Sequence, residues 1–282
     1  MPNTPSPPNV DQIGHWNDAM GKTWAMLHDR LDRQLDPIGR EAMQRASFET
    51  GDEVLDVGCG CGETTLEIAG KVGRITGLDA SAMLLDIARE AAKARAIANI
   101  SFVQGDGQVW RAPRPVDVLF SRFGVMFFED PAAAFANLRA SLKPGGRLAF
   151  ACWRQPKENL WLALPMQATQ HLLPALPPSD PHAPGPFAFA DKDRLAGILA
   201  GAGFTDVAIE PLDLRTGGDS LEESVFIALR VGQLGGALRE IGASEELKRQ
   251  VEATLREALA SYVEDGVVKL PAAAWIVSGR NP

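Results

Sequence analysis

Short apolar runs typical of β-strands alternate with helical stretches from residue 53 to residue 153, and this alternation limits the fold more than any other feature. The runs are Glu53–Val57, Arg74–Asp79, Ile100–Gln104, Val116–Ser121 and Arg147–Trp153. Apolar strands that alternate with helices indicate a parallel sheet with helices on both faces and right-handed crossovers. Two later strands are expected over Thr205–Leu214 and Val267–Ser278. We therefore predict an α/β fold with a doubly wound, mainly parallel seven-stranded sheet.

The segments around this alternation differ in composition. Four prolines lie within the first nine residues, and six more lie between residues 174 and 186. Apolar residues recur at helical spacing from Trp16 to Ala46, with an expected break at Pro37. We predict a disordered tail over 1–12, an N-terminal helical cap over 13–50, the core over 51–153, a Pro-rich lid loop over 154–190, and completion of the core sheet over 191–282.

Residues 219–265 are predicted to form a helical insertion of two amphipathic helices, Leu221–Leu234 and Glu245–Val263. Such an insertion is expected to close a lid over a site, because water exclusion favours group transfer. The same helices are equally compatible with a homodimer interface, and the sequence does not choose between the two.

Composition excludes several classes of protein. The chain has 282 residues, with 28 Lys and Arg against 36 Asp and Glu, so its net charge is −8. Without a basic cluster it has no electrostatic footprint for nucleic acid. It has no apolar run long enough to span a membrane and no signal-like N-terminus, so a cytoplasmic location is expected. Cys59 and Cys61 are spaced too closely for a zinc half-site.

A glycine-rich turn, Asp56-Val-Gly58-Cys-Gly60-Cys-Gly62, lies between the first strand and its helix. Free backbone N–H groups and the positive end of a helix dipole favour a bound polar group there. Glycines let such a ligand approach the backbone closely. A tight strand-to-helix connection is the alternative explanation of this turn on its own.

Two acidic residues at the ends of the next strands support a nucleoside site. Asp79 follows the glycine turn at about the 20-residue offset at which an acid meets ribose hydroxyls. Asp106 ends the third strand and would accept a hydrogen bond from the amino group of an adenine. The turn reads GxGxG, since Glu63 stands where the dinucleotide fingerprint needs glycine. NAD and FAD are therefore second choices.

These features resemble the class I S-adenosylmethionine-dependent methyltransferases, which have a Rossmann-like core. VLDVGCGCGETTLEIA, GLDAS, FSRFGVMFFEDP and LKPGGRLAFACW resemble the small-molecule group that includes the ubiquinone and menaquinone biosynthesis enzymes. The resemblance covers about residues 50–153 and implies S-adenosylmethionine as cofactor. It implies that Gly58, Gly60, Gly62 and Ser121 lie at the methionine portion, Asp79 at the ribose, Asp106 and Gly107 at the adenine, and Met83 over the adenine ring, with Asp56 and Ala80 in the same cofactor-binding set.

The resemblance also narrows the acceptor. The chain lacks the Asn/Asp-Pro-Pro-aromatic segment of enzymes that methylate amino groups of nucleic-acid bases, and it lacks the acidic ligands of cation-dependent catechol methyltransferases. We therefore expect a small-molecule acceptor, no nucleic acid and no metal. The predicted substrate-binding residues are aromatic and fit an apolar acceptor: Trp16, Trp24, Phe123, Phe127 and Trp153. Trp161 is a further aromatic residue in the loop after the fifth strand.

In-line methyl transfer depends mainly on proximity and orientation of the two reactants. A hydroxyl acceptor would also gain from a general base, and His15 and His28 in the predicted cap are the candidates. The acceptor atom, oxygen, carbon or nitrogen, stays open. Two other functions also stay open: a non-catalytic cofactor-binding or regulatory protein on the same fold, and an NAD-dependent oxidoreductase.

Overall fold

The computed structural model describes residues 8–175, 180–217 and 219–282. Its sheet has the strand order β3-β2-β1-β4-β5-β8-β6, with the two-residue strand β7 paired to β8. The prediction of a doubly wound, mainly parallel sheet is confirmed, with β7 as an addition. The strands are β1 (Glu53–Val57), β2 (Arg74–Asp79), β3 (Ile100–Gln104), β4 (Val116–Arg122), β5 (Leu142–Trp153), β6 (Thr205–Gly217), β7 (Val263–Glu264) and β8 (Val267–Arg280).

The strand order reverses direction at β1. Strand β1 pairs in parallel with β2 on one side and with β4 on the other. The chain therefore builds β2 and β3 outward in one direction, returns, and builds β4 and β5 outward in the other. Loops that leave β1 and β4 at their carboxyl ends diverge, and the crevice between them is where ligands bind in such sheets.

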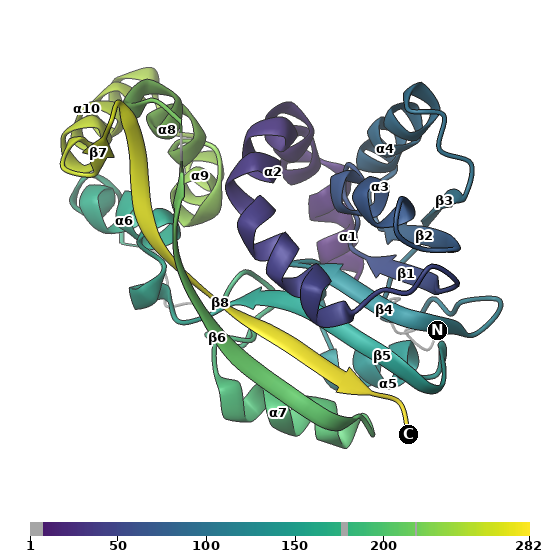
Figure 1. The fold of residues 1–282 in the computed structure, drawn as a ribbon. Helices are drawn as coiled ribbons and strands as arrows, with labels where there is room; N and C mark the ends of the chain where they lie inside the picture. Colours follow the sequence, from purple (N-terminus) through teal and green to yellow (C-terminus); the bar gives the residue numbers. More distant parts are fainter. Residues whose placement is uncertain (1–7, 176–179, 218) are drawn as a thin grey trace, which may run out of the picture.

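Helices cover both faces of the sheet (Figure 1). One face carries α2 (Ala19–Ala46), α3 (Glu63–Ala69) and α4 (Ala82–Ala94), and the other carries α5 (Pro131–Arg139) and α7 (Lys192–Gly201). Strand β5 is buried over its last six residues because both faces are covered. Helix ends follow local chemistry: the side chains of Ser81 and Asp130 accept hydrogen bonds from backbone N–H groups in the first turns of α4 and α5.

The N-terminal segment departs from the predicted tail and cap. Helix α1 (Val10–Asn17) begins inside the predicted tail 1–12, and Asn9 before it is buried; residues 1–7 of that tail lie outside the described residues. The predicted break at Pro37 is wrong, because α2 continues through it and the chain bends at Asp18 instead. Pro37 and Arg33, whose carbonyl loses its donor to the proline, are both exposed, and at an exposed position water can satisfy that carbonyl.

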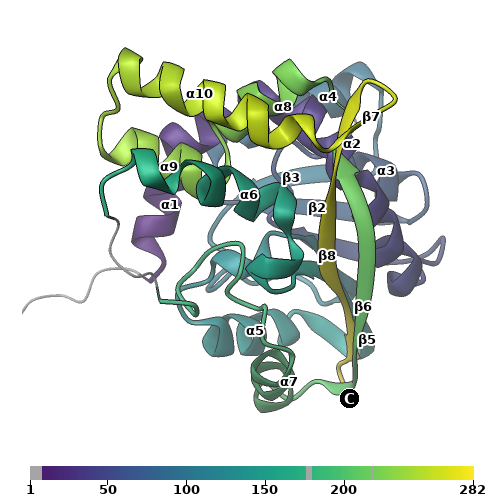
Figure 2. The same ribbon diagram turned by 90° about the vertical axis from the view of Figure 1, so that its left-hand side faces the viewer.

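A separate helical group stands at one end of the molecule, beyond the ends of the long strands β6 and β8 (Figures 1 and 2). The insertion 219–265 contributes three helices to this group, whereas two were predicted. Turns at Gly232 (φ 72°) and Gly242 (φ 56°) separate these helices. A fourth helix lies within the segment predicted as a lid loop, of which residues 176–179 lie outside the described residues. The group consists of α6 (Leu160–Thr169), α8 (Leu221–Ala228), α9 (Gly232–Glu240) and α10 (Glu245–Ala260).

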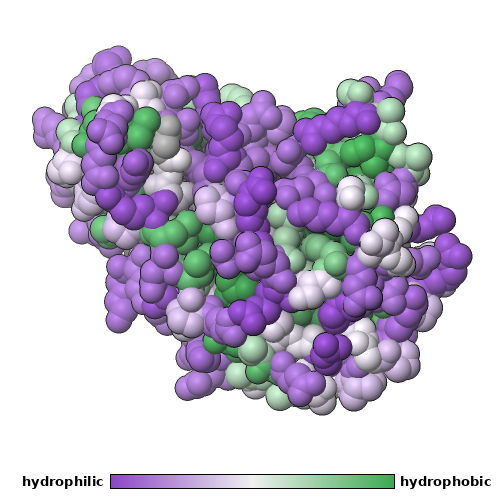
Figure 3. All heavy atoms as spheres, in the orientation of Figure 1, coloured by the Kyte–Doolittle hydropathy of each residue, from purple (hydrophilic) through white to green (hydrophobic). Residues whose placement is uncertain are grey.

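These helices enclose a hydrophobic cluster of their own, which includes Val225, Leu234, Val251 and Leu255. Short 3₁₀ turns, Val125–Phe127, Pro156–Glu158 and Gln170–Leu172, complete the secondary structure of the described residues. Hydrophilic side chains cover most of the face shown in Figure 3, including the surface over α10. Among the described residues, no helix combines the length and the apolar character needed to cross a bilayer.

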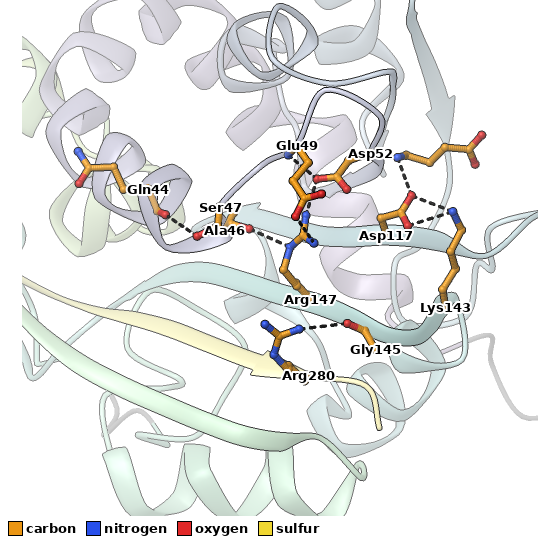
Figure 4. Close-up of polar contacts among 11 residues, drawn as sticks. Gln44, Ala46, Ser47, Glu49, Asp52, Asp117, Lys143, Gly145, Arg147 and Arg280 are labelled. Atoms are coloured by element: carbon orange, nitrogen blue, oxygen red, sulfur yellow. Dashed lines mark hydrogen bonds and ion pairs between the residues drawn. The ribbon is translucent and has the colours of Figure 1, made fainter.

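Ion pairs join the amino ends of the central strands, at the sheet edge opposite the crevice (Figure 4). Arg147 of β5 is paired with Asp52, and its Nε donates to the carbonyl of Ala46 at the end of α2 at 3.1 Å. Asp117 of β4 accepts from the backbone N–H of Glu53 at 2.9 Å and is paired with Lys143. These contacts fix the end of α2 on the sheet, so that the other half of α2 is held over the crevice.

Candidate active site

A cavity of about 360 Å³ lies at the carboxyl edge of the sheet, between the ends of β1 and β4. Its volume falls in the range of small-molecule sites. Residues of α1, α2, α6 and α9 and the loops after β1, β2, β3, β4 and β5 line it. Most of the predicted residues meet in its wall: Asp56, Gly58, Gly60, Asp79, Ala80, Asp106, Gly107, Trp16, Trp24, Phe123, Phe127, Trp153 and Trp161.

The glycine turn brings backbone to backbone at the switch point. Gly58 has φ 72°, and a Cβ built on it would lie 2.6 Å from Cα of Gly124, in the loop after β4. The Gly58 N–H donates to the carbonyl of Leu78 at 2.8 Å. A side chain at Gly58 would therefore push the two loops apart. Trp24 covers the turn, with its Nε1 3.9 Å from the Cβ position of Gly60.

Asp79 is fixed by backbone donors on both of its carboxylate oxygens. The N–H of Gly60 donates to Oδ2 and the N–H of Ser81 donates to Oδ1, each at 2.8 Å. Burial raises the pKa of Asp79 above its ordinary value, against these hydrogen bonds, which lower it. Each oxygen keeps a further lone pair, so this carboxylate could accept hydrogen bonds from a pair of ribose hydroxyls.

Asp106 has one carboxylate oxygen in use and one without a partner. Its Oδ1 accepts from Nδ2 of Asn9 at 3.1 Å and from the N–H of Gln108 at 2.9 Å. Its Oδ2 is buried and has no hydrogen-bond partner within the described residues. A buried acceptor left unsatisfied is costly. The amino group of an adenine is a donor that fits this position.

Asp56 is almost fully buried beneath the glycine turn. Oγ1 of Thr65 donates to its Oδ2 at 2.6 Å. Burial raises the pKa of Asp56 to about 6, although the Thr65 hydrogen bond and the charge of Arg122 oppose the rise. This carboxyl group therefore holds a proton in the folded state at pH values where an exposed aspartate has lost it.

This raised pKa predicts a pH-dependent stability. The unfolded chain releases the Asp56 proton near pH 3.9, whereas the folded chain keeps it to about pH 6. The folded state thus binds more protons in this window, and the contribution of Asp56 to the free energy of unfolding falls as pH rises. The free energies of unfolding of wild type and Asp56→Asn in urea should diverge by about 2 kcal/mol between pH 4 and 7, in favour of the variant at high pH. A difference that stays constant with pH would contradict this.

The rest of the cavity is walled by aromatic rings. Phe123 stacks on Trp153 with centroids 4.1 Å apart, and Trp153 lies 5.2 Å from Trp161. Trp16 packs edge-on against Phe127 at 5.1 Å. Phe123 has φ 64°, a strained conformation for a bulky residue, and such strain is concentrated at functional sites. This strained backbone places its ring on Trp153.

Three predicted cofactor residues do not line the cavity. Gly62 precedes α3, where a Cβ would lie 2.8 Å from that of Ala88, so its role is packing. The Ser121 hydroxyl is buried and donates to the carbonyl of Val57 at 2.7 Å, so it joins β4 to β1 instead of facing a ligand. Met83 lies outside the wall, and Leu84, one residue later on α4, lines it.

Neither predicted catalytic histidine reaches the cavity. His15 is exposed on α1, because the turn of the helix that carries Trp16 inward carries its neighbour outward. His28 is half-buried beside Asp29, with its Nδ1 3.4 Å from Oδ1 of that residue. The spacing of four between Trp24 and His28 does place them on one side of α2, but the residues of this helix that line the cavity are Met20, Trp24, Asp32 and Leu35, and His28 is not among them.

Several wall residues were missed by the sequence analysis. Arg122 and Asp32 form a largely buried ion pair in the wall. Arg122 could have been predicted to line the site from its position at the carboxyl end of β4. Gly124 could have been predicted as a close approach of two loops, because it is a glycine two residues after that strand. No sequence signal identifies the wall residues that come from α1 and the residue before it, the start of α2, α4 and the helical group: Asn9, Gln12, Ile13, Met20, Leu84, Val231, Gly232 and Gln233.

Asn9 ties α1 over the site. Besides its bond to Asp106, its backbone N–H donates to Oε2 of Glu129 at 2.6 Å, and its Oδ1 accepts from the N–H of Glu129 at 3.2 Å. Asn17 at the other end of α1 donates to the carbonyl of Ala80 at 2.9 Å. Helix α1 is thus held at both ends across residues of the cavity wall.

The Asn9 contact predicts an effect on ligand release. Asn9→Gly keeps the backbone geometry, since Asn9 has φ 63°, but removes both side-chain hydrogen bonds. We expect S-adenosylhomocysteine to dissociate about tenfold faster, because the lost bond to Asp106 is charge-assisted. Stopped-flow tryptophan fluorescence would measure the rate, with Lys22→Ala on the exposed side of α2 as control. Equal rates for both variants would show that α1 does not limit release.

The cavity supplies no evident metal centre. Among the described residues, no group of three or more His, Cys, Asp or Glu side chains is arranged to hold a metal ion. Cys59 and Cys61 are both free thiols, and burial raises the pKa of Cys61 to about 12.

Comparison with known proteins identifies the domain. Residues 54–146 match the family described as methyltransferase domain. The chain is 34% identical over 128 residues to aklanonic acid methyltransferase DauC of Streptomyces sp. strain C5, which covers 44% of the chain and 58% of that protein. It is 28% identical over 209 residues to demethylmenaquinone methyltransferase of Corynebacterium kroppenstedtii, covering 70% and 87%. It is 29% identical over 173 residues to trans-aconitate 2-methyltransferase of Klebsiella pneumoniae, covering 57% and 64%. The match thus spans less than two thirds of the first and third of these relatives.

Solved structures share the fold. The [4+2]-cyclase SpnF superimposes with a TM-score of 0.61 at 19% identity, over 99% of both chains. Phosphoethanolamine N-methyltransferase 2 of Haemonchus contortus, solved with S-adenosylhomocysteine, gives a TM-score of 0.54 at 17% identity, over 87% of this chain and 52% of that one. Taken together, the matched family model and the named relatives show that residues 54–146 form a methyltransferase domain similar to that of enzymes that methylate small molecules.

Proposed function

We propose that this protein transfers a methyl group from S-adenosylmethionine to a small, planar, apolar molecule. One observation carries the proposal: a single cavity has the glycine turn, Asp79 and Asp106 in one half and stacked aromatic rings in the other. Bound S-adenosylmethionine would supply a methyl group already activated by its positively charged sulfur. In the proposal Asp79 holds the ribose, Asp106 the adenine, and Gly58 and Gly60 the methionine portion.

The protein contributes orientation and water exclusion. The close approach of Gly58 to Gly124 brings the loop that carries Phe123 next to the glycine turn. The Phe123–Trp153 pair can then hold a flat acceptor near the activated methyl group, as a near-attack geometry requires. Helix α1 covers one side, and Pro186, Phe187 and the start of α9 cover another. These segments keep water from the site, which is the lid role proposed for this part of the chain.

Charge in the wall favours an apolar acceptor over a polyanionic one. Within the described residues, Arg122 is the one cationic side chain that lines the cavity, and its guanidinium is paired with Asp32. The relatives act on aklanonic acid, demethylmenaquinone and trans-aconitate according to their names. The aromatic wall makes the first two the better guides. Three free, buried cysteines agree with action in the reducing cytoplasm; a homodimer through α8–α10 stays a prediction.

Two measurements test the proposal. Calorimetric titration should show micromolar binding of S-adenosylmethionine and S-adenosylhomocysteine and none of NADH. Mass spectrometry should then find products 14 mass units heavier when the protein is incubated with S-adenosylmethionine and a panel of quinones and phenols. Binding of the cofactor with no methylated product from any acceptor would favour a non-catalytic protein on this fold, and binding of NADH alone would favour an oxidoreductase.

A further inference from the structure

Each acidic side chain that lines the cavity is either bonded within the protein or lies in the half that the cofactor would fill. Asp32 is paired with Arg122, and Asp79 accepts two backbone hydrogen bonds. Asp56 and Asp106 lie beneath the glycine turn and at the end of β3, in the half that the cofactor would fill. Cys59 and Cys61 are neutral thiols, since burial raises their pKa values. Among the described residues, no histidine, lysine, glutamate or tyrosine lines the cavity.

The segments outside the described residues do not change this inventory. Residues 1–7, 176–179 and 218 consist of methionine, proline, asparagine, threonine, serine, leucine and glycine. None of these side chains titrates near neutral pH. A general base for the acceptor is thus not among the side chains that the wall presents.

The aromatic half of the wall offers hydrogen-bond donors. Nε1 of Trp161 is buried and has no partner among the described residues, and an indole N–H can only donate. Beside it, Gly232 begins α9, with its Cβ position 3.9 Å from the carbonyl of Leu162. No side chain caps this helix, and its first residues, Gly232 and Gln233, line the cavity, so the uncapped N–H groups and the positive end of the helix dipole lie at the cavity wall.

From these observations we infer that the acceptor binds as its own anion: a planar, apolar molecule with an acidic hydroxyl group, of the hydroxyquinone or enolised dicarbonyl class. The inference rests on the proposed function and specifies its substrate. The aromatic rings take the flat body of the acceptor, and the N–H donors stabilise its negative oxygen. A neutral alcohol or amine would leave the Trp161 donor without a strong acceptor.

The chemistry then needs no proton transfer within the site. The acceptor loses its hydroxyl proton to the solvent before it binds. A lone pair on its oxygen forms the new bond to the methyl carbon while the bond from sulfur to that carbon breaks, and the electron pair stays on sulfur. An anion and a sulfonium cation thus give two neutral products. The acidity of the acceptor, and not an enzyme base, sets the fraction of acceptor that is ionised and able to react.

A coloured acceptor tests the inference without turnover. The neutral and anionic forms of 2-hydroxy-1,4-naphthoquinone differ in visible absorbance, so its ionisation can be followed on the protein saturated with S-adenosylhomocysteine. We expect the bound dye to show the anion spectrum and an apparent pKa below that of the free dye. Binding of the neutral form, or a raised apparent pKa, would overturn the inference.

Variants locate the oxyanion contact. Trp161→Phe keeps the ring and removes the N–H, and it should weaken binding of the dye about tenfold while binding of uncharged 1,4-naphthoquinone stays unchanged. Trp110→Phe removes an indole outside the cavity and is the matched control. An equal loss for both ligands in Trp161→Phe would show a packing role and would argue against the oxyanion contact.

Turnover separates this inference from the proposed function. Across phenols of graded acidity, kcat/KM should rise about tenfold per pH unit at pH values below the pKa of each acceptor. The inflection of this pH profile should shift with the pKa of the acceptor. An inflection fixed at one pH for every acceptor would reveal an enzyme base and overturn the inference alone. Binding of S-adenosylhomocysteine without dye binding and without transfer to any acceptor would overturn the proposed function, and the inference with it.

Discussion

Asp79→Asn should weaken binding of S-adenosylhomocysteine by about a hundredfold, as measured by calorimetric titration. Both carboxylate oxygens of Asp79 accept from backbone N–H groups, those of Gly60 and Ser81. An amide in its place must turn its NH₂ toward one of these donors, so the glycine turn or the start of α4 loses its contact. The hydrogen bonds to the ribose also lose their charge, and a charged acceptor is worth about 1.5–3 kcal/mol per bond.

The control for this change is Asp86→Asn. Asp86 lies on α4, where it is exposed and paired with Arg89. It does not line the cavity. Its amide should bind S-adenosylhomocysteine as wild type does. Thermal unfolding of both variants would verify that they are folded at the titration temperature. Wild-type affinity in folded Asp79→Asn would mean that the ribose is held elsewhere, and the cofactor half of the site would have to be reassigned.

Gly58→Ala should lower the free energy of unfolding by about 2–5 kcal/mol and abolish cofactor binding. Alanine at φ 72° costs about 1–2 kcal/mol. Its Cβ would also lie 2.6 Å from Cα of Gly124, and overpacking of backbone against backbone adds about 1–3 kcal/mol. Because both loops line the cavity, relief of the clash would move Phe123 away from the glycine turn.

Gly145→Ala separates these two costs. Gly145 has nearly the same backbone angle, φ 75°, but a Cβ there would meet nothing within 4 Å. It lies in β5 at the opposite edge of the sheet, so it should lose only the conformational part, about 1–2 kcal/mol, and keep cofactor binding. Urea unfolding and titration would compare the variants. Equal losses of stability in both would refute the close approach of the β1 and β4 loops.

The core of the fold can be predicted from the sequence because its signals are local. Strand ends are fixed by short-range patterns, and parallel strands present their carboxyl ends at one edge of the sheet. Once Glu53–Val57, Arg74–Asp79 and Ile100–Gln104 are read as neighbouring strands, their terminal residues must lie together. Asp56, Asp79 and Asp106 could therefore be placed in one site from the sequence, and the structure puts all three in the cavity wall.

The failures occur where a neighbour in space overrides the local pattern. The prolines of the first residues suggest a tail, yet Asn9 is buried by contacts with Glu129 and Asp106, about 100 residues away in sequence. Pro37 ordinarily breaks a helix, but α2 is held on the sheet from both sides of it by Leu35 and Ile38, which are buried. Packing of this apolar side offsets the missing hydrogen bond.

The class of fold, the glycine turn and the acids at the strand ends could be predicted from the sequence, because each depends on residues within one strand–turn–helix unit. Which side chains face the cavity depends instead on tertiary packing. Neighbouring residues on a helix point in different directions, so Trp16 lines the cavity and His15 does not. For the same reason Leu84 lines the cavity and the predicted Met83 does not. Tertiary packing also places Trp161 beside Trp153 of the Phe123–Trp153 stack, and places the start of α9, which is distant in sequence, in the same cavity wall. Those contacts depend on how the helical group packs against the core, which no local pattern encodes.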